Sequence, residues 1–274
     1  MRFYTREDTE SFEAVRFLFI KTALTADTFR ITLNRPEKRN AFTPVMAEEI
    51  IFALAYAHYH SEIRCIILDA EGPVFCAGAD LNSFHEAVVV KNETLPEIRD
   101  EARLGEAFAQ LFKPSIAQVE GSVLAGGFLL ICGCTFVISV EDAIFSLPEV
   151  KRGIWPMQVM ASLLPIVPKR KILEMSITGW KYTAEQALAL GLVTKIVSTD
   201  EIGKVVNEVA AEICQNAPYA IRLGMESLNT LSDVREGDQH TFLKSQLNKL
   251  VLTEDAQEGT SAFKEKRNPI WKGR

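Results

Sequence analysis

Short apolar strands that alternate with amphipathic helices constrain the fold of this chain more than any other feature. Residues 28–33 alternate apolar and polar side chains, as on a half-buried strand, and residues 15–20 largely do the same. Thr43-Pro44 then forms an N-cap and a first helical turn, and apolar residues recur at helical spacing to about Tyr59. The next run, 65–68, is continuously apolar, which is typical of a strand whose sheet is covered by helices on both faces.

The same order of elements returns further along the chain. A capping box at 183–186 begins a short helix that stops at Gly191. The other expected elements are strands at 74–76, 115–119, 135–139, 143–145 and 192–197, a helix after the small residues 77–81, and a helix after a glycine-rich turn within 121–131. Together these patterns predict an α/β core of repeated ββα units over residues 1–197.

After residue 197 the strands stop and helical patterns follow one another. They cover 200–215, 218–231 and 238–250. No low-complexity tract or Gly/Ser linker separates them from the core. We therefore expect a second, helical region over residues 198–274 that packs on the core or on another subunit.

Composition and charge limit the class of protein. The chain has 274 residues and a net charge of −6, so no general attraction to nucleic acid or to a membrane surface is expected, and an anionic ligand must be held locally. The uncharged stretch 123–140 is interrupted by glycines, which favours a buried helix and strand over a membrane span. An odd number of cysteines, five, and a charged opening segment indicate reduced thiols, no secretory signal and a cytoplasmic location.

Two loops place small residues where a strand turns into a helix. One covers 75–81 and the other 120–127. Free amides at two helix N-termini that converge on one point would stabilise an oxyanion. The alternative interpretation is close packing of helix against sheet, for which glycine is also suited.

The chain resembles the crotonase, or enoyl-CoA hydratase/isomerase, superfamily. The resemblance runs through residues 31–41, the Cys-Ala-Gly-Ala-Asp-Leu loop at 76–81, Ala-Gly-Gly at 125–127, Leu-Pro-Glu at 147–149, 183–187 and the closing segment 262–269. It implies a crotonase-like spiral of ββα units, an acyl-CoA thioester substrate and a helical C-terminal region used to assemble a homotrimer or a hexamer built as a dimer of trimers. It also implies an oxyanion hole, whose donors in this chain would be the amides of Ala79 and Gly126.

The resemblance places one catalytic carboxylate at Glu149, where a surface glutamate capping a turn is the alternative interpretation. Hydratases of this family usually carry two catalytic glutamates, the first at the position that Leu129 occupies here. Because that glutamate is absent, Glu149 alone must both take and return the proton. Trp155 and its apolar neighbours indicate a bulky, apolar pocket. Loss of a carboxylate that helps hold water, together with apolar walls, favours isomerisation slightly over hydration.

Recognition of CoA is also implied by the resemblance. The residues that would line the pantetheine and adenine are Lys38, Arg39, Ala41, Ala77, Asp80, Leu81 and Asn82. Lys266 would approach a phosphate of the CoA across a subunit boundary. For each charged side chain alone, ordinary solvent exposure is the alternative. Asp80 is also a candidate helix cap, and His85 is a candidate second base.

The sequence thus predicts an enzyme of fatty acid metabolism that isomerises or hydrates an enoyl-CoA, without a cofactor beyond the CoA of its substrate. No metal is expected, since Cys132 and Cys134 are too closely spaced and too apolar in their surroundings for a zinc site. The rival hypotheses are an acyl-CoA- or RNA-binding scaffold without activity, and another thioester reaction such as decarboxylation or hydrolysis.

Overall fold

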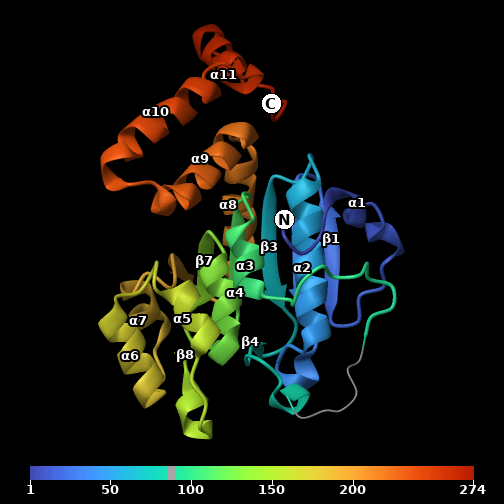
Figure 1. Ribbon diagram of the computed structural model, residues 1–274, viewed down its shortest axis with the longest axis vertical. Helices are drawn as coiled ribbons and strands as arrows, with labels where there is room; N and C mark the ends of the chain where they lie inside the picture. The colour runs from blue at the N-terminus through green and yellow to red at the C-terminus, as the bar shows by residue number, and fades with distance from the viewer. Residues whose placement is uncertain (85–90) are drawn as a thin grey trace.

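A six-stranded sheet forms the centre of the computed structural model, which describes residues 1–84 and 91–274 (Figure 1). Its strands, in spatial order, are β1 (Ile20–Thr25), β2 (Thr28–Leu33), β3 (Cys65–Ala70), β5 (Ser115–Val119), β7 (Phe136–Val140) and β9 (Lys195–Val197). The first pair is antiparallel and every later pair is parallel. A sheet of this kind needs helices on both faces, because its crossover connections lie there.

Helices α2 (Pro44–Tyr59) and α8 (Ile202–Cys214) cover the two faces of this sheet. α2 packs on β1 and β2, whereas α8 packs on β3, β5 and β7. Alternation along β2 separates the faces: Phe29 lies against the Tyr56 ring of α2, and the next residue, Arg30, donates to Asn207 of α8. The helix predicted from Thr43 to about Tyr59 is confirmed, with the Thr43 hydroxyl accepting from the Met46 amide.

A smaller sheet holds three short parallel strands, β4 (Val74–Cys76), β6 (Ser122–Leu124) and β8 (Phe145–Ser146). β6 is the central strand and pairs with both others. Gly121 turns the chain from β5 into β6 at very close range, since a Cβ added there would lie 2.3 Å from the Pro73 carbonyl oxygen. This sheet matters for function because the two small-residue loops both leave from it.

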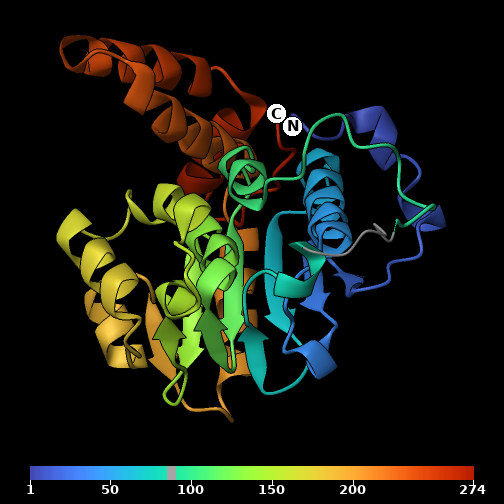
Figure 2. The same cartoon turned by 60° about the horizontal axis from the view of Figure 1, so that its bottom comes forward.

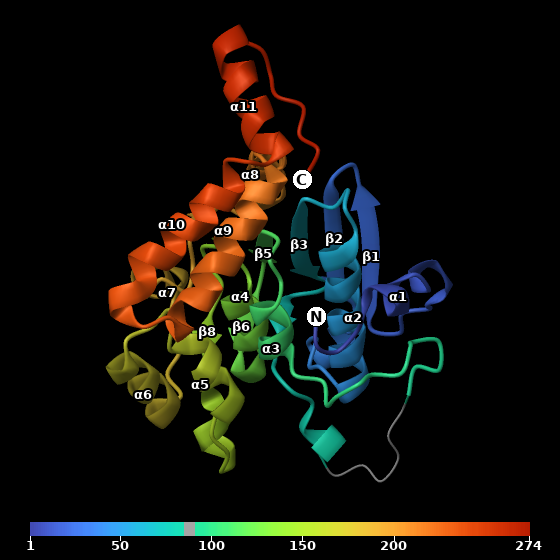
Figure 3. The same cartoon turned by 45° about the horizontal axis from the view of Figure 1, so that its top comes forward.

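The remaining helices lie around the two sheets and beyond them. They are α1 (Arg6–Thr9), α3 (Leu104–Ala109), α4 (Phe128–Gly133), α5 (Met157–Leu163), α6 (Lys169–Thr178), α7 (Ala184–Ala189), α9 (Pro218–Thr230), α10 (Gln239–Leu250) and α11 (Glu254–Glu265). Helices α9 to α11 lie above the sheets in the views of Figures 1 and 2, and in Figure 3 α9 and α10 lie in front of the core while α11 extends beyond it. No helix in the described part of the chain is long and apolar enough to cross a membrane.

The α/β class and the helical C-terminal region are confirmed, as are the helices expected at 200–215, 218–231 and 238–250. Since α8 packs on the central sheet, the helical region begins as part of the core layer. The division of the chain into 1–197 and 198–274 stays a prediction. The stretch 123–140 was expected to form a buried helix and strand. It contains most of β6 together with α4 and β7.

The strand expected at 15–20 is wrong. The amides of Leu18 and Phe19 donate to the buried carboxylate of Glu49 on α2, so they are not available to a strand partner, and β1 begins only at Ile20. The helix expected after 77–81 is, within the described residues, a short 3-10 turn at Leu81–Phe84. The pattern over 121–131 also missed β6, which is only three residues long.

Replacing Gly121 with alanine tests how closely the two sheets are joined. The added Cβ meets a backbone oxygen that no side-chain rotation can relieve, so we expect destabilisation of about 1–3 kcal/mol. The control is Gly203→Ala in α8, where a Cβ would have no neighbour within 4 Å. Urea unfolding should show a lower midpoint for Gly121→Ala and an unchanged or raised one for Gly203→Ala. Equal midpoints for the two variants would contradict this account of the turn.

Candidate active site

The three strands of the small sheet deliver three loops to one edge. Because β4, β6 and β8 are parallel, the residues that follow them all leave from their carboxyl ends. Cys76, Val123 and Phe145 are in register across the sheet. Ala79 and Gly126 each lie three residues beyond their strand's register position, and Glu149 lies four beyond. The sheet therefore brings the two predicted donors and the predicted carboxylate to the same edge.

The amide of Ala79 is aimed by an isolated parallel bridge to Phe42. The Phe42 amide donates to the Gly78 carbonyl at 2.9 Å, and the Asp80 amide donates to the Phe42 carbonyl at 2.9 Å. Backbone groups of successive residues point to opposite sides of an extended chain. The Ala79 N–H therefore points away from the backbone of Phe42 and is left for another acceptor.

Glycines let the Ala79 and Gly126 loops touch. Gly78 has φ +92°, and a Cβ there would lie 2.8 Å from the Gly126 nitrogen. In the other direction, a Cβ at Gly126 would lie 3.3 Å from the Ala79 nitrogen and 2.9 Å from the Phe42 ring. Gly126 is the second residue of the 3-10 turn Ala125–Gly127, where an N–H has no acceptor inside the turn. The two amides are thus close together and both are free to face a ligand.

Glu149 is a buried carboxylate that lacks a full set of partners. It lies in the 3-10 turn Pro148–Arg152 directly after β8, and 8% of its surface is exposed. Its Oε2 atom is buried and has no hydrogen-bond partner among residues 1–84 and 91–274. Burial raises the pKa of Glu149, and a hydrogen bond from its own backbone together with the charge of Arg152 only partly offsets this effect. A buried carboxylate oxygen without a partner is costly for folding alone, which favours a role with a bound molecule.

Leu129 and Trp155, the apolar residues expected at the substrate pocket, lie on the segments that follow the Gly126 loop and the Glu149 turn. Leu129 lies on α4, three residues after Gly126, with 5% of its surface exposed. A Cβ added to Gly105 of α3 would lie 3.7 Å from the Leu129 side chain, so Leu129 packs toward α3. Trp155 is half-buried after the Glu149 turn, and its indole N–H lies 3.1 Å from the Met160 sulfur. No carboxylate stands at the Leu129 position.

The residues expected to contact CoA divide into two groups. Most lie in two adjoining loops, where the Ala77 amide donates to the Arg39 carbonyl at 3.0 Å and the Ala41 amide donates to the Lys38 carbonyl at 3.0 Å. Lys38, Arg39, Leu81 and Asn82 are exposed, whereas Ala41, Ala77 and Asp80 are half-buried. The Asp80 carboxylate accepts from the Asn82 amide and from Arg35.

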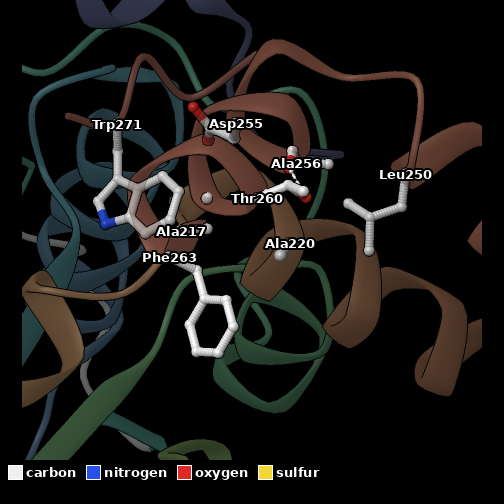
Figure 4. Close-up of a pocket in the computed structure, with 9 residues that line it drawn as sticks. Ala217, Ala220, Leu250, Asp255, Ala256, Thr260, Phe263 and Trp271 are labelled. Atoms are coloured by element: carbon white, nitrogen blue, oxygen red, sulfur yellow. Dashed lines mark hydrogen bonds between the residues drawn. The ribbon is translucent and has the colours of Figure 1, made fainter. Parts of the chain in front are cut away.

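Lys266 is not brought to this group within one chain. It ends α11, which lies at the far end of the molecule from β4 and β8 (Figure 1). A cavity of about 470 Å³ opens beside α11, with Trp271 and Leu250 on opposite sides and Phe263 between them (Figure 4). This cavity is remote from the three loops. His85, the candidate second base, lies outside the described residues.

Arg35 and Phe42 have roles that sequence reasoning missed. Arg35 contacts both the Ala41 carbonyl and the Asp80 carboxylate, and Phe42 forms the bridge to Ala79. Both residues stand in or beside the polar loop that carries the family resemblance. The signal was present in that loop, but only the fold shows that it lies against residues 77–80. Among residues 1–84 and 91–274, no group of three or more potential metal ligands is assembled.

Comparisons with known proteins identify the family of this chain. A family model described as enoyl-CoA hydratase/isomerase matches residues 25–274. The chain is 33% identical over 252 residues to a mevalonyl-coenzyme A hydratase of Aspergillus fumigatus, covering 88% of this chain and 90% of the relative. It is 35% identical over 250 residues to a carnitinyl-CoA dehydratase of Salmonella typhimurium, covering 89% and 94%.

Solved structures show the same fold. An enoyl-CoA hydratase/isomerase from Mycobacterium paratuberculosis superposes with a TM-score of 0.84 at 28% identity, covering 94% of this chain and 100% of that one. An enoyl-CoA hydratase from Bacillus anthracis gives a TM-score of 0.82 at 28% identity, with the same coverage. The match over nearly the whole length means that this chain belongs to the enoyl-CoA hydratase/isomerase family of the crotonase superfamily and is an enzyme of that family.

Proposed function

We propose that the protein acts on an enoyl-CoA thioester, with the amides of Ala79 and Gly126 as its oxyanion hole and Glu149 as its single acid/base. The observation that carries the proposal is the common edge of β4, β6 and β8, which holds two free amides and a buried carboxylate together. Coenzyme A enters as part of the substrate. The proposed site uses no metal and no further cofactor.

The chemistry follows from where charge develops. Removal of a proton beside a thioester, or addition of water to its conjugated double bond, places negative charge on the carbonyl oxygen. Two preorganised N–H groups stabilise that charge better than they stabilise the neutral carbonyl, and loss of one such donor typically lowers turnover about 10²–10³-fold. Glu149 takes the proton from the carbon next to the carbonyl and returns it at the far end of the double-bond system, which moves the double bond.

Isomerisation is the reaction that the residues around Glu149 favour. Leu129, at the position where the resemblance expects a second carboxylate, is a buried apolar side chain and cannot hold a water. Hydration is the second candidate, and the hydratase and dehydratase names of the relatives support it. Both reactions use the same amides and the same Glu149. They differ in whether a water molecule stands beside the substrate.

The product distinguishes these reactions. Purified protein is incubated with 2-enoyl- and 3-enoyl-CoA esters of several chain lengths, and the products are identified by mass and chromatography. Isomerisation leaves the mass unchanged and moves the double bond, whereas hydration adds one water. Release of carbon dioxide from a carboxylated acyl-CoA, release of free CoA, or tight binding without turnover would each replace the proposal with a rival.

We propose further that the protein is a cytoplasmic enzyme of fatty acid metabolism that assembles as a homotrimer or a dimer of trimers. Large apolar side chains are exposed along α9 to α11, namely Leu228, Leu243, Leu247, Val251, Leu252 and Phe263. Burial of these side chains between subunits would stabilise an assembly. It would also bring Lys266 of one subunit toward the CoA of another. Sedimentation of the purified protein tests the assembly.

Substituting Glu149 by glutamine tests its role as acid and base. The amide keeps the shape of the side chain but cannot accept the proton, so we expect turnover to fall about 10²–10⁴-fold. Stability at pH 7 should be equal or higher, because the variant no longer buries a charge. Glu141→Gln, on the exposed turn after β7, is the matched control with unchanged turnover. Wild-type turnover by Glu149→Gln would remove Glu149 from the mechanism.

The raised pKa of Glu149 predicts a particular pH dependence. The base must be ionised, so kcat/KM should rise with pH through a limb that lies above the ordinary carboxyl value of 4.5. Arg152 lowers the pKa of Glu149, so Arg152→Gln should move this limb to higher pH, and added salt should reduce the difference. Lys169→Gln, a charge change elsewhere on the surface, should leave the limb in place. A limb at or below 4.5 would show that Glu149 is not the titrating base.

A further inference from the structure

A chain of hydrogen bonds runs from the guanidinium of Arg35 to the amide of Ala79. Arg35 Nη1 donates to the Ala41 carbonyl oxygen at 2.7 Å. The next amide, Phe42 N–H, donates to the Gly78 carbonyl oxygen at 2.9 Å. The next amide after that carbonyl is Ala79 N–H. Two peptide units therefore separate a permanent cation from the proposed oxyanion donor.

The geometry of the peptide group makes this chain directional. In a trans peptide the C=O and N–H bonds point in opposite directions, and the structure contains no cis peptide among its described residues. A donor that holds the Ala41 oxygen therefore aims the Phe42 N–H away from Arg35 and toward Gly78. The same relation at the next peptide aims the Ala79 N–H onward. Hydrogen bonds in such a chain also polarise one another, which makes the last N–H a stronger donor.

A second contact of Arg35 holds the other side of Ala79. The same Nη1 atom donates to Asp80 Oδ2 at 2.7 Å, and the Asp80 amide is held by the Phe42 carbonyl. The two side chains of this ion pair are only 13% and 12% exposed, so solvent weakens it little. Burial opposes ionisation of Asp80, but its bond to Arg35, its Asn82 contact and the nearby Lys38 hold the pKa of Asp80 below its ordinary value.

We infer that Arg35 is a positioning residue, which acts through the Ala41–Phe42 and Gly78–Ala79 peptides and through Asp80 to aim the Ala79 N–H at the thioester oxygen. This inference rests on the proposed function, since it assigns a support to one donor of the oxyanion hole. It also gives Asp80 a defined role: its carboxylate anchors the loop to Arg35.

The test compares turnover and binding separately. Arg35→Gln removes the cation, Arg35→Lys keeps it, and Asp80→Asn keeps the shape of the anchor while removing its charge. We expect Arg35→Gln to lower kcat about 10–10²-fold with KM changed by no more than about threefold, because a donor displaced by about 1 Å has an effect of that size. Arg35→Lys should recover part of kcat. Asp80→Asn should lower kcat without raising KM.

The matched control is a second half-buried ion pair, Arg30 with Asp69, which lies on the central sheet beside α8. Arg30→Gln should leave kcat unchanged even where it lowers the unfolding midpoint. A spectroscopic measurement tests the same inference without relying on turnover. Its probe is bound [1-¹³C]butanoyl-CoA, which cannot be isomerised. Its carbonyl stretch should move to lower frequency when bound to the wild type and should move less when bound to Arg35→Gln. A general loss of stability would not change this frequency in the folded fraction.

The outcomes separate this inference from the proposed function. Gly126→Ala places a Cβ 3.3 Å from the Ala79 nitrogen and should abolish turnover if the oxyanion hole is correctly assigned. If Gly126→Ala and Glu149→Gln both lose activity while Arg35→Gln keeps its kcat and its carbonyl shift, the inference fails and the proposed function stands. If Gly126→Ala and Glu149→Gln keep wild-type turnover, the proposed function fails. A higher KM with unchanged kcat for Asp80→Asn would make Asp80 a substrate contact and overturn its role as anchor.

Discussion

Parallel pairing of β4, β6 and β8 is the constraint on which the proposed chemistry depends. Each strand is only two or three residues long, and each ends where a functional loop begins. Hydrogen bonds between the strands fix the register, and the register places Ala79, Gly126 and Glu149 at one edge. Adjacent strands lie about 4.8 Å apart, so neighbouring loops leave this edge side by side and the outer two, after β4 and β8, leave it about 10 Å apart.

Close approach of these loops depends on glycines, which carry no side chain. A Cβ at Gly78 would lie 2.7 Å from the Ala125 side chain, and one at Gly126 would lie 2.9 Å from the Phe42 ring. A Cβ at Gly127 would likewise lie 2.8 Å from the Cys76 carbonyl oxygen. The glycines thus keep two amides near each other without a side chain between them. Their N–H dipoles are positioned before substrate arrives, so little reorganisation is needed when charge develops on the oxygen.

Burial opposes the ionisation of both Glu149 and Asp80, but their different partners shift the two pKa values in opposite directions. Glu149 has a buried oxygen without a partner and a raised pKa, which suits a group that accepts and returns a proton. Asp80 is bound to Arg35 and its pKa is lowered, so it stays ionised and serves as a fixed anchor. The proposed proton-transfer group and the proposed anchor thus have pKa values shifted in opposite directions, because Asp80 is in direct contact with a cation.

Local patterns in the sequence determined much of this protein. The Thr43 cap, the capping box at Thr183 and the apolar run of β3 each predicted their element from neighbouring residues, since caps and periodicity are local properties. Only the tertiary structure decided the contacts between distant segments. The Glu49 carboxylate accepts from the amides of Leu18 and Phe19, so β1 begins only at Ile20. Arg35 donates to Asp80 where their two loops pack together. These contacts join residues 30 to 45 positions apart, and such pairings depend on how the whole chain packs, which no short stretch of sequence specifies.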